Sequence, residues 1–312
     1  MKKKVNNQEI RKKLFCTALT SILIFCGHSG LVYAAPGDAQ TDAVPAESAQ
    51  TAESSETQST VPGLTDEELE EYYGDSVFIG DSIMVGFRNY SAKQETFVRN
   101  IQFLAVGSYS AFNAMKPVNS DNVHPMYKGK KSQVWDAISL IGSKRAFILL
   151  GMNDISILGL EGARDKYKEL INKILETSPD IEINIISVTY TLAGQGAGKL
   201  NNKNLAQYNV LLEEMAEENG WGYLDLCTLL SDGNGNLESK YCSDGFVHLS
   251  TSAYTLWEST LIEYANAQSA QEEAETAETK TATETETPKE TPSKMETILE
   301  TVPTQTTKGR LE

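Results

Sequence analysis

A serine and a histidine in the central part of the chain could together form a nucleophilic site. A serine hydroxyl is a poor nucleophile until a positioned base takes its proton, and imidazole is the usual base. Ser82 follows an apolar stretch, and His248 lies in a polar loop much later in the chain. The other histidine beyond residue 34 is His124, in the polar stretch 122–125 just before the lysine-rich run 128–131. His248 is therefore the better candidate for the base.

Two further residues could stabilise the charge that attack by Ser82 would create. An acyl-transfer intermediate needs N–H donors directed at its oxyanion, and losing one donor typically costs about 100–1,000-fold in turnover. Gly107 would let the backbone approach a substrate closely, and Asn153 would supply an uncharged side-chain N–H. Asp81 is better interpreted as a residue that hydrogen-bonds around the turn than as an acid catalyst.

Each of these residues also has a purely structural interpretation. Ser82 could cap a helix, and Gly107 and Gly151 could be ordinary turn residues. The pair at 153–154 could cap the next element, and His248 could simply precede a helix cap. Their positions relative to the secondary structure distinguish the two interpretations.

The region from residue 64 to residue 266 alternates short apolar strands with amphipathic helices. The pattern predicts strands at 77–79, 97–106, 146–150, 181–188 and 222–226. Apolar residues recur at helical spacing within 134–141, 167–174, 205–215 and 254–264, and Gly220 is available to end the third of these helices. Thr65 with Glu68 predicts a capping box before a short first helix. This alternation predicts an α/β fold of three layers, in which helices cover both faces of a parallel, flavodoxin-like, five-stranded sheet.

Ligands of such folds bind at the carboxyl ends of the strands. Ser82 follows the first predicted strand, Gly107 the second and Asn153 the third, and His248 lies in the last loop before the final helix. The residues that could perform chemistry thus lie where the strand ends converge. The structural interpretations leave this ordered set unexplained.

The same segments resemble the motifs of the SGNH (GDSL-like) hydrolases. The match comprises Gly-Asp-Ser at 80–82, a glycine at 107, Gly-Met-Asn-Asp at 151–154 and Asp-Gly-Phe-Val-His-Leu at 244–249, and it covers about residues 75–265. The resemblance implies that Ser82 is the nucleophile and His248 the general base. It also implies an oxyanion hole formed by the backbone N–H groups of Ser82 and Gly107 and the side-chain amide of Asn153, with no metal and no cofactor.

One departure from the family pattern concerns the acid of the last motif. The family usually places this acid three residues before the histidine, whereas Asp244 lies four residues before His248 and Gly245 occupies the expected position. The extra residue could bulge outward and leave Asp244 aligned with the imidazole. Alternatively, a backbone carbonyl orients the imidazole, and the site is a Ser-His dyad.

Two glycine-rich segments are not expected to bind ligands of their own. The segment 194–199 lacks the flanking residues of a phosphate-binding loop and is interpreted as a flexible loop at the rim of the site. The segment 232–236 lacks the glycine and the glutamate of a calcium loop and is interpreted as a surface turn.

The two ends of the chain have compositions unlike the centre. Six basic residues within 1–13, an apolar run over 14–25 and small residues at Val32 and Ala34 predict a signal peptide over 1–34 with cleavage after Ala34. The run is shorter than a membrane span of roughly 20 residues, and the bulky residues before Cys26 argue against lipidation. Residues 35–63 and 267–312 are predicted to be a disordered linker and a disordered Thr/Glu-rich tail on either side of the domain 64–266.

Charge and cysteine content narrow the classes of partner. The chain has a formal charge of −16, and residues 64–266 alone contain 27 acidic and 16 basic side chains, which argues against nucleic acid as a partner. Cys227 and Cys242 are the cysteines beyond the signal peptide; a disulfide between them and two free thiols are equally compatible with the sequence. The scarcity of histidine argues against a Cys/His zinc site.

The function expected from these features is that of a secreted serine esterase acting through an acyl-enzyme, with O-acetyl groups of polysaccharide or cell wall as the first substrate class. The alternatives are a lysophospholipase or other lipid acylhydrolase, and a catalytically silent glycan-binding module at the cell surface. Association with the cell wall would fit export, and the sequence does not specify an oligomeric state.

Overall fold

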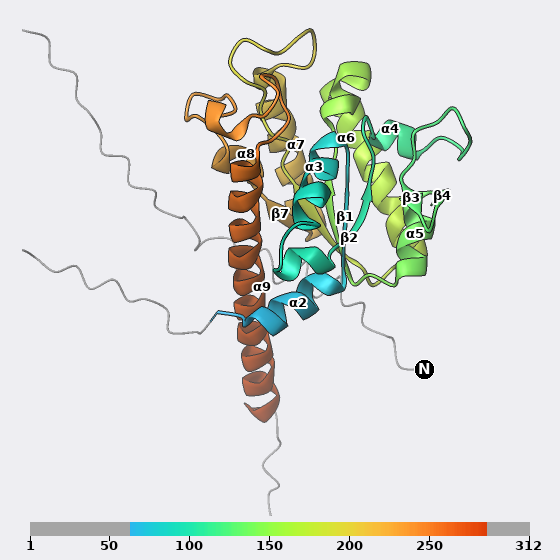
Figure 1. Cartoon of the computed structure of the whole chain (residues 1–312). Coiled ribbons are helices and arrows are strands. Elements are labelled where there is room, and N and C mark those ends of the chain that lie inside the picture. Colours follow the sequence, from blue (N-terminus) through green and yellow to red (C-terminus); the bar gives the residue numbers. More distant parts are fainter. Residues whose placement is uncertain (1–62, 286–312) are drawn as a thin grey trace, which may run out of the picture. The chain divides into compact units, whose positions relative to one another are not determined.

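Five strands form one parallel sheet, as the sequence predicted (Figure 1). The structure is a computed structural model and describes residues 63–285. The strands are β1 (Ser76–Gly80), β2 (Gln102–Ala105), β5 (Arg145–Leu149), β6 (Glu182–Ile186) and β7 (Gly222–Leu224), in the spatial order β2-β1-β5-β6-β7. This order is that of flavodoxin-like sheets.

Helices cover both faces of the sheet (Figure 1). The longer helices are α2 (Asp66–Gly74), α3 (Ser82–Ser91), α5 (Val134–Ile141), α6 (Met152–Thr177), α7 (Asn202–Asn219) and α9 (Thr251–Thr285). On one face, Phe87 of α3 stacks on Trp257 of α9 with ring centroids 4.3 Å apart, and Tyr73 of α2 donates a hydrogen bond to the carbonyl of Leu261. Helices α5, α6 and α7 pack on the other face, where Tyr167 of α6 donates to the carbonyl of Ile148 in β5.

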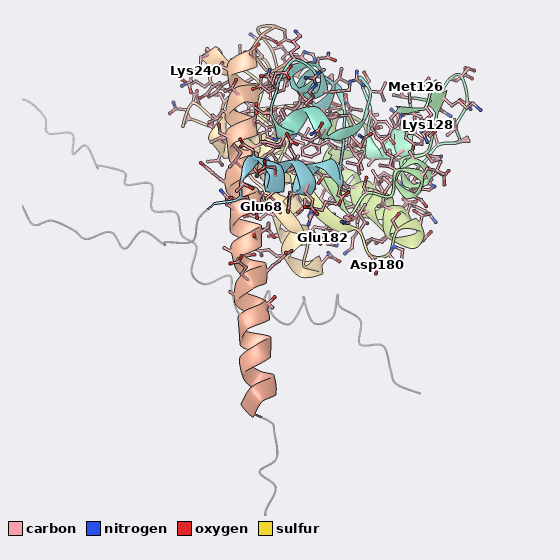
Figure 2. All side chains as sticks on the ribbon, turned by 60° about the horizontal axis from the view of Figure 1, so that its bottom comes forward. Glu68, Met126, Lys128, Asp180, Glu182 and Lys240 are labelled. Carbon is pink, nitrogen blue, oxygen red and sulfur yellow. The ribbon has the colours of Figure 1, made fainter. Side chains whose placement is uncertain are left out.

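Short elements complete the described chain. They are the 3₁₀ turns η1 (Phe97–Asn100) and η2 (Ser239–Tyr241), the helices α4 (Ala111–Ala114) and α8 (Leu226–Leu229), and a hairpin of β3 (Met126–Tyr127) and β4 (Lys130–Lys131). Figure 2 labels Met126 and Lys128 at this hairpin and shows Glu68, Asp180 and Glu182 at the edge where the strands begin. The candidate residues Ser82, Gly107 and Asn153 follow β1, β2 and β5, so they lie at the opposite edge, where the strands end.

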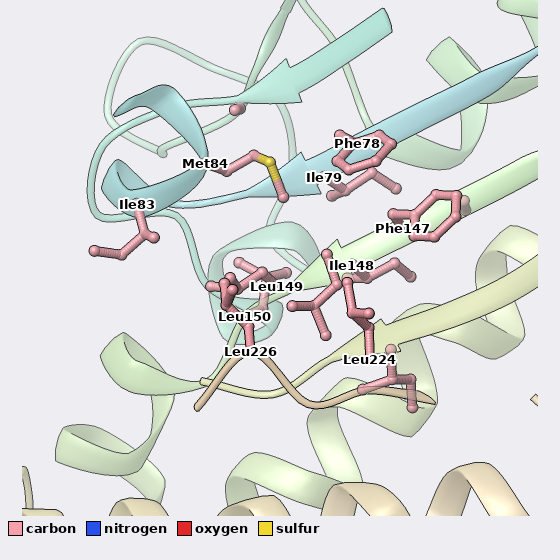
Figure 3. Packing of buried hydrophobic residues seen from close by; sticks show 14 of the residues in the cluster. Phe78, Ile79, Ile83, Met84, Phe147, Ile148, Leu149, Leu150, Leu224 and Leu226 are labelled. Carbon is pink, nitrogen blue, oxygen red and sulfur yellow. The ribbon is translucent and has the colours of Figure 1, made fainter. Parts of the chain in front are cut away.

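The core is built from strand residues that are buried on both faces of the sheet. All five residues of β1 are buried, and Phe78 stacks on Phe147 of the neighbouring strand at 4.6 Å between centroids (Figure 3). Continuous apolar strands of this kind are typical of parallel sheets covered by helices. The sheet therefore holds the strand ends, and the loops that follow them, in fixed positions.

Several local predictions are confirmed by the structure. Thr65 and Glu68 form a capping box at the start of α2. Gly220 ends α7 in the left-handed conformation, where a glycine carries no Cβ penalty. The segment 232–236 is a surface turn in which the Asp232 carboxylate accepts the backbone N–H groups of Asn234 and Asn236.

Three predictions differ from the structure. The stretch 97–106 is not one strand, because residues 97–100 form η1 and only Gln102–Ala105 pair with β1. The fifth strand ends at Leu224, because the Asp225 side chain caps α8 by accepting the N–H of Thr228. Helix α9 continues to Thr285, whereas composition predicted disorder from about residue 267; the alanine, glutamate and glutamine of this segment favour helix even though they have little to bury.

Other predictions concern segments that the structure does not describe. The predicted signal peptide over 1–34 and, apart from Gly63, the predicted linker 35–63 lie outside the described residues, as does the part of the predicted tail beyond residue 285. Within residues 63–285, no helix has both the length and the apolar character to cross a bilayer.

Cys227 and Cys242 are free thiols, so the structure does not contain the disulfide that the sequence allowed.

Candidate active site

Ser82, His248 and Asp244 form one hydrogen-bonded chain at the carboxyl edge of the sheet. The Ser82 Oγ lies 3.0 Å from His248 Nε2, and His248 Nδ1 lies 2.5 Å from Asp244 Oδ2. With Asp244 ionised, Nδ1 carries the proton and Nε2 is free to accept one from the serine hydroxyl. The sequence prediction thus selected the histidine that contacts Ser82.

The one-residue shift of Asp244 is absorbed within its own loop. Gly245 has a φ of 75°, a left-handed conformation that side-chain-bearing residues rarely adopt. The loop therefore folds back over the carboxylate, and Asp244 Oδ1 accepts the backbone N–H groups of Phe246, Val247 and His248. Of the two arrangements that the sequence allowed, the structure has Asp244 aligned with the imidazole.

The same hydrogen bonds determine the ionisation of Asp244. Its slight burial acts to raise its pKa, but the bonds from the His248 ring and the three backbone N–H groups outweigh burial and hold the pKa of Asp244 well below its usual range. Asp244 is therefore ionised at neutral pH and can stabilise a protonated imidazole.

A tight turn between β1 and α3 presents the serine. The Asp81 side chain accepts the N–H of Ile83 at 3.0 Å and so caps α3, which means that Asp81, and not Ser82, has the capping role. A Cβ at Gly80 would lie 2.6 Å from the Met84 Cβ and 2.8 Å from the Leu149 carbonyl oxygen, so only glycine fits there. The Ser82 hydroxyl is left available to His248.

Gly107 and Asn153, the residues predicted to complete the oxyanion hole with Ser82, differ in their existing contacts. Gly107 is exposed, and a Cβ added to it would meet no atom within 4 Å, so space for a ligand adjoins it. The Asn153 amide nitrogen instead donates to Asp81 Oδ2 at 2.9 Å and to the Tyr109 carbonyl at 3.1 Å. Both partners are acceptors, which fixes the amide with its nitrogen towards them. Both of its hydrogens are thus engaged inside the protein.

Comparison with known proteins identifies the family of this chain. The sequence profile described as the GDSL-like lipase/acylhydrolase family matches residues 78–256, more than half of the chain. The chain belongs to the GDSL-like lipase/acylhydrolase family. The matched residues include Ser82, Gly107, Asn153, Asp244 and His248.

Solved structures with distant similarity include further members of this family and esterases. A GDSL-like lipase from Bacteroides thetaiotaomicron is 15% identical over 62% of this chain and 88% of its own, with a TM-score of 0.46. An acetyl-xylooligosaccharide esterase mutant from Geobacillus Stearmophilus is 12% identical over 60% and 92%, with a TM-score of 0.42. A peptidoglycan O-acetylesterase is 11% identical over 55% and 47%, with a TM-score of 0.39. A search of curated proteins gave no match.

Asp154 is the residue of the GDSL-like site that sequence reasoning missed. Its carboxylate is fully buried and accepts the N–H of Ala111 at 3.0 Å and that of Phe112 at 2.8 Å, so it holds the start of α4. The structural alternative for the pair at 153–154 was a cap on the next element of the chain, whereas Asp154 caps α4, which precedes it. The signal available was the sequence Asn153-Asp154 at the start of α6, but nothing local identifies the distant donors.

Burial shifts the pKa values of both buried aspartates, Asp81 and Asp154, upwards. Loss of solvent raises the pKa of Asp81 to about 6, although the N–H of Ile83 opposes the shift and the nearby charge of Asp154 adds to it. Burial likewise raises the pKa of Asp154 to about 6, against the hydrogen bonds from Phe112 and Ala111. Two buried carboxyl groups close to each other disfavour simultaneous ionisation.

His124 and the glycine-rich loop 194–199 are not part of the hydrogen-bonded chain of Ser82, His248 and Asp244. His124 is buried beside Tyr109, with ring centroids 6.4 Å apart, and burial lowers its pKa. Leu192, just before the glycine-rich loop 194–199, donates its N–H to the Phe246 carbonyl in the histidine loop. Residues 63–285 contain no cluster of three or more His, Cys, Asp and Glu side chains suited to a metal ion.

The pKa of Asp81 predicts how stability varies with pH. In the unfolded chain this carboxyl titrates near 3.8, and in the folded chain near 6, so folding favours the protonated form. Stability attributable to Asp81 is therefore present below about pH 4 and is lost as the pH rises to about 6, by up to about 3 kcal/mol. Urea unfolding between pH 4 and pH 7 should show this fall in the wild type and a weaker fall in Asp81→Asn.

A matched control is Asp180→Asn, which removes an exposed carboxylate at the other end of the sheet. This variant should keep the wild-type dependence on pH. Equal pH dependence in Asp81→Asn and the wild type would contradict the assignment of the raised pKa to Asp81.

Proposed function

We propose that this member of the GDSL-like lipase/acylhydrolase family is a serine esterase in which Ser82 forms an acyl-enzyme. The observation that supports this role is the hydrogen-bonded chain from the Ser82 hydroxyl through the His248 imidazole to the Asp244 carboxylate. Such a chain activates a serine for acyl transfer and orients the base that serves it.

The proposed reaction has two halves. Ser82 Oγ attacks the ester carbonyl carbon while its proton passes to His248 Nε2, and Asp244 stabilises the imidazolium that results. Collapse of the tetrahedral intermediate breaks the ester C–O bond, and His248 returns the proton to the departing alcohol. Water then attacks the acyl-enzyme by the same proton route, which releases the carboxylic acid and restores Ser82.

The developing oxyanion is proposed to bind to the backbone N–H groups of Ser82 and Gly107 and to the Asn153 amide. Gly107 has open space beside it. Asn153 Nδ2 already donates to Asp81 and to the Tyr109 carbonyl, so its donation to the oxyanion requires one of these bonds to lengthen or to be shared. The negative charge of an oxyanion makes it a stronger acceptor than a neutral carbonyl, which favours exchange with the Tyr109 carbonyl.

The substitution Ser82→Ala tests the role of Ser82 as the nucleophile. The variant should lose hydrolysis of nitrophenyl acetate by at least about 1,000-fold, because no other group forms the acyl-enzyme. A fluorophosphonate probe should label the wild type and fail to label the variant. The control is Ser139→Ala, which removes an exposed serine of α5 and should leave the rate and the labelling unchanged.

Retained hydrolysis in Ser82→Ala, with unfolding curves like those of the wild type, would overturn the proposed function. Absence of labelling in the wild type would favour a catalytically silent glycan-binding module. The shifted position of Asp244 does not favour that alternative, since Asp244 contacts His248 directly.

The substrate class that we propose is an O-acetyl ester of polysaccharide or cell wall. The predicted signal peptide supports it, because export brings the enzyme to such polymers. The excess of 11 negative charges in residues 64–266 supports a neutral ester over a phosphorylated substrate. A lysophospholipid or another lipid ester is the second candidate, and the word lipase in the family description is compatible with it.

Hydrolysis rates across acyl chains of increasing length distinguish the two substrate classes. For an acetylesterase, kcat/KM for nitrophenyl esters should be highest for acetate and fall by at least about 10-fold at eight carbons, because a site shaped for acetyl has no room for the added methylenes. In a lipid acylhydrolase each buried methylene, at about 0.8 kcal/mol, should instead raise kcat/KM by up to about fourfold. Acetate release from acetylated xylan and acetylated peptidoglycan should accompany this profile. Rates that rise with chain length, together with activity on lysophospholipid vesicles, would identify a lipid acylhydrolase instead.

We propose that the protein is exported and cleaved after Ala34, from the basic start of the chain and the apolar run that follows it. Expression of the full chain in a secreting bacterial host should give a mature protein whose N-terminal sequence begins at Ala35. Replacement of Val32 and Ala34 by bulky residues should block this cleavage. An uncleaved Met1 terminus on cytosolic protein would contradict export, and fractionation of the cell wall would test association with it.

A further inference from the structure

We propose that Asp154 is a positioning residue that sets the geometry of the oxyanion hole by holding the Gly107 segment against Asn153. The inference rests on the proposed serine esterase function. It assigns a role to a residue that neither contacts Ser82 nor belongs to the chain from Ser82 to Asp244.

The carboxylate of Asp154 binds two consecutive backbone donors. Oδ2 accepts the N–H of Ala111 at 3.0 Å, and Oδ1 accepts that of Phe112 at 2.8 Å. A carboxylate accepts at both oxygens at once, whereas an amide of the same shape offers one acceptor and one donor. Two parallel N–H donors therefore match aspartate and conflict with asparagine.

Helix α4 depends on this contact because it is too short to be stable alone. It contains four residues, and a single turn of helix is unfavourable without outside support. Asp154 takes the N–H groups of Ala111 and Phe112, and Ser110 Oγ takes that of Asn113 at 3.0 Å. These three bonds satisfy donors that the first turn cannot satisfy internally.

The segment fixed in this way carries the proposed oxyanion donor. Gly107 lies three residues before Ser110, and between them the backbone carbonyl of Tyr109 accepts a hydrogen bond from the Asn153 amide at 3.1 Å. The neighbours Asn153 and Asp154 thus hold the same loop at two points, at Tyr109 and at the start of α4. The separation between the Gly107 N–H and the Asn153 amide in the free enzyme follows from these two contacts. The contact of Asp154 with α4 remains when the Asn153 amide exchanges the Tyr109 carbonyl for the oxyanion, so Asp154 continues to hold the segment in place.

A purely stabilising role explains the choice of residue less well. Ionising a carboxyl group at a fully buried position opposes folding, as the raised pKa of Asp154 reflects. A chain selected only for stability could cap α4 at lower cost from an exposed loop residue. Rigid placement of donors, in contrast, directly benefits the reaction, because misplacement by about 1 Å can cost on the order of 100-fold in rate.

The test uses Asp154→Asn in the full chain. We expect kcat for nitrophenyl acetate to fall by about 10–100-fold, because the Gly107 N–H is displaced from the oxyanion position, while KM stays within about 3-fold of the wild-type value. The His248 Nδ1 proton resonance should stay at its wild-type shift, since the contacts between Ser82, His248 and Asp244 are untouched. The control is Asp165→Asn, an exposed carboxylate on the same helix, which should retain wild-type kcat and KM.

A second variant keeps the proposal testable if Asp154→Asn fails to fold. Ser110→Ala leaves the buried carboxylate in place but removes the cap on the Asn113 N–H and a hydrogen bond to Asp154. It should lower kcat by about 3–10-fold, the effect of one lost hydrogen bond, again with little change in KM. Unchanged kcat in either folded variant would overturn the proposal. A fall in kcat accompanied by a shift or loss of the His248 Nδ1 proton resonance would also overturn it.

Failure of this proposal is distinguishable from failure of the proposed function. Labelling and hydrolysis that depend on Ser82 would still establish the serine esterase if Asp154→Asn were fully active. Hydrolysis that does not depend on Ser82 would instead remove the basis of both proposals, the serine esterase function and the positioning role of Asp154.

Discussion

Burial of two carboxyl groups beneath the ends of β1 and β5 is the constraint on which the site depends. Asp81 and Asp154 have almost no exposed surface, and a buried carboxyl group is tolerated only where donors satisfy it. Here the donors are backbone and amide N–H groups of the elements that carry the functional residues. Satisfying the carboxylates therefore forces the turn at Ser82, the start of α4 and the side chain of Asn153 into one arrangement.

The three aspartates of the site lie at different depths. Asp244 is at the surface, where its hydrogen bonds hold its pKa low and keep it charged. Asp81 and Asp154 are inside, where burial raises the pKa of each to about 6. The exposed aspartate can respond to a change of charge on His248, whereas the buried pair mainly fixes positions. The same residue type thus has two functions because its environment differs.

The fold and most of the site could be predicted from local signals. Five apolar strands and the helices between them were recognisable by their periodicity, and the order of the segments along the chain identified Ser82, Gly107, Asn153 and His248. The prediction was less accurate where local and tertiary effects compete. Residues 97–100 are apolar enough for a strand but turn before β2, and the charged stretch after residue 267 has good helix formers without a core to cover.

By itself, the sequence determined which residue types are available at each strand end, because strand and helix periodicity depends only on neighbouring residues. The tertiary structure alone decided how they are joined. Asp244 contacts the imidazole despite its shifted spacing because Gly245 adopts a left-handed conformation. The Asn153 amide is engaged by Asp81 and Tyr109, and Asp154 caps a helix more than 40 positions earlier in the chain. These contacts join residues remote in sequence, so they exist only once the sheet has brought the strand ends together.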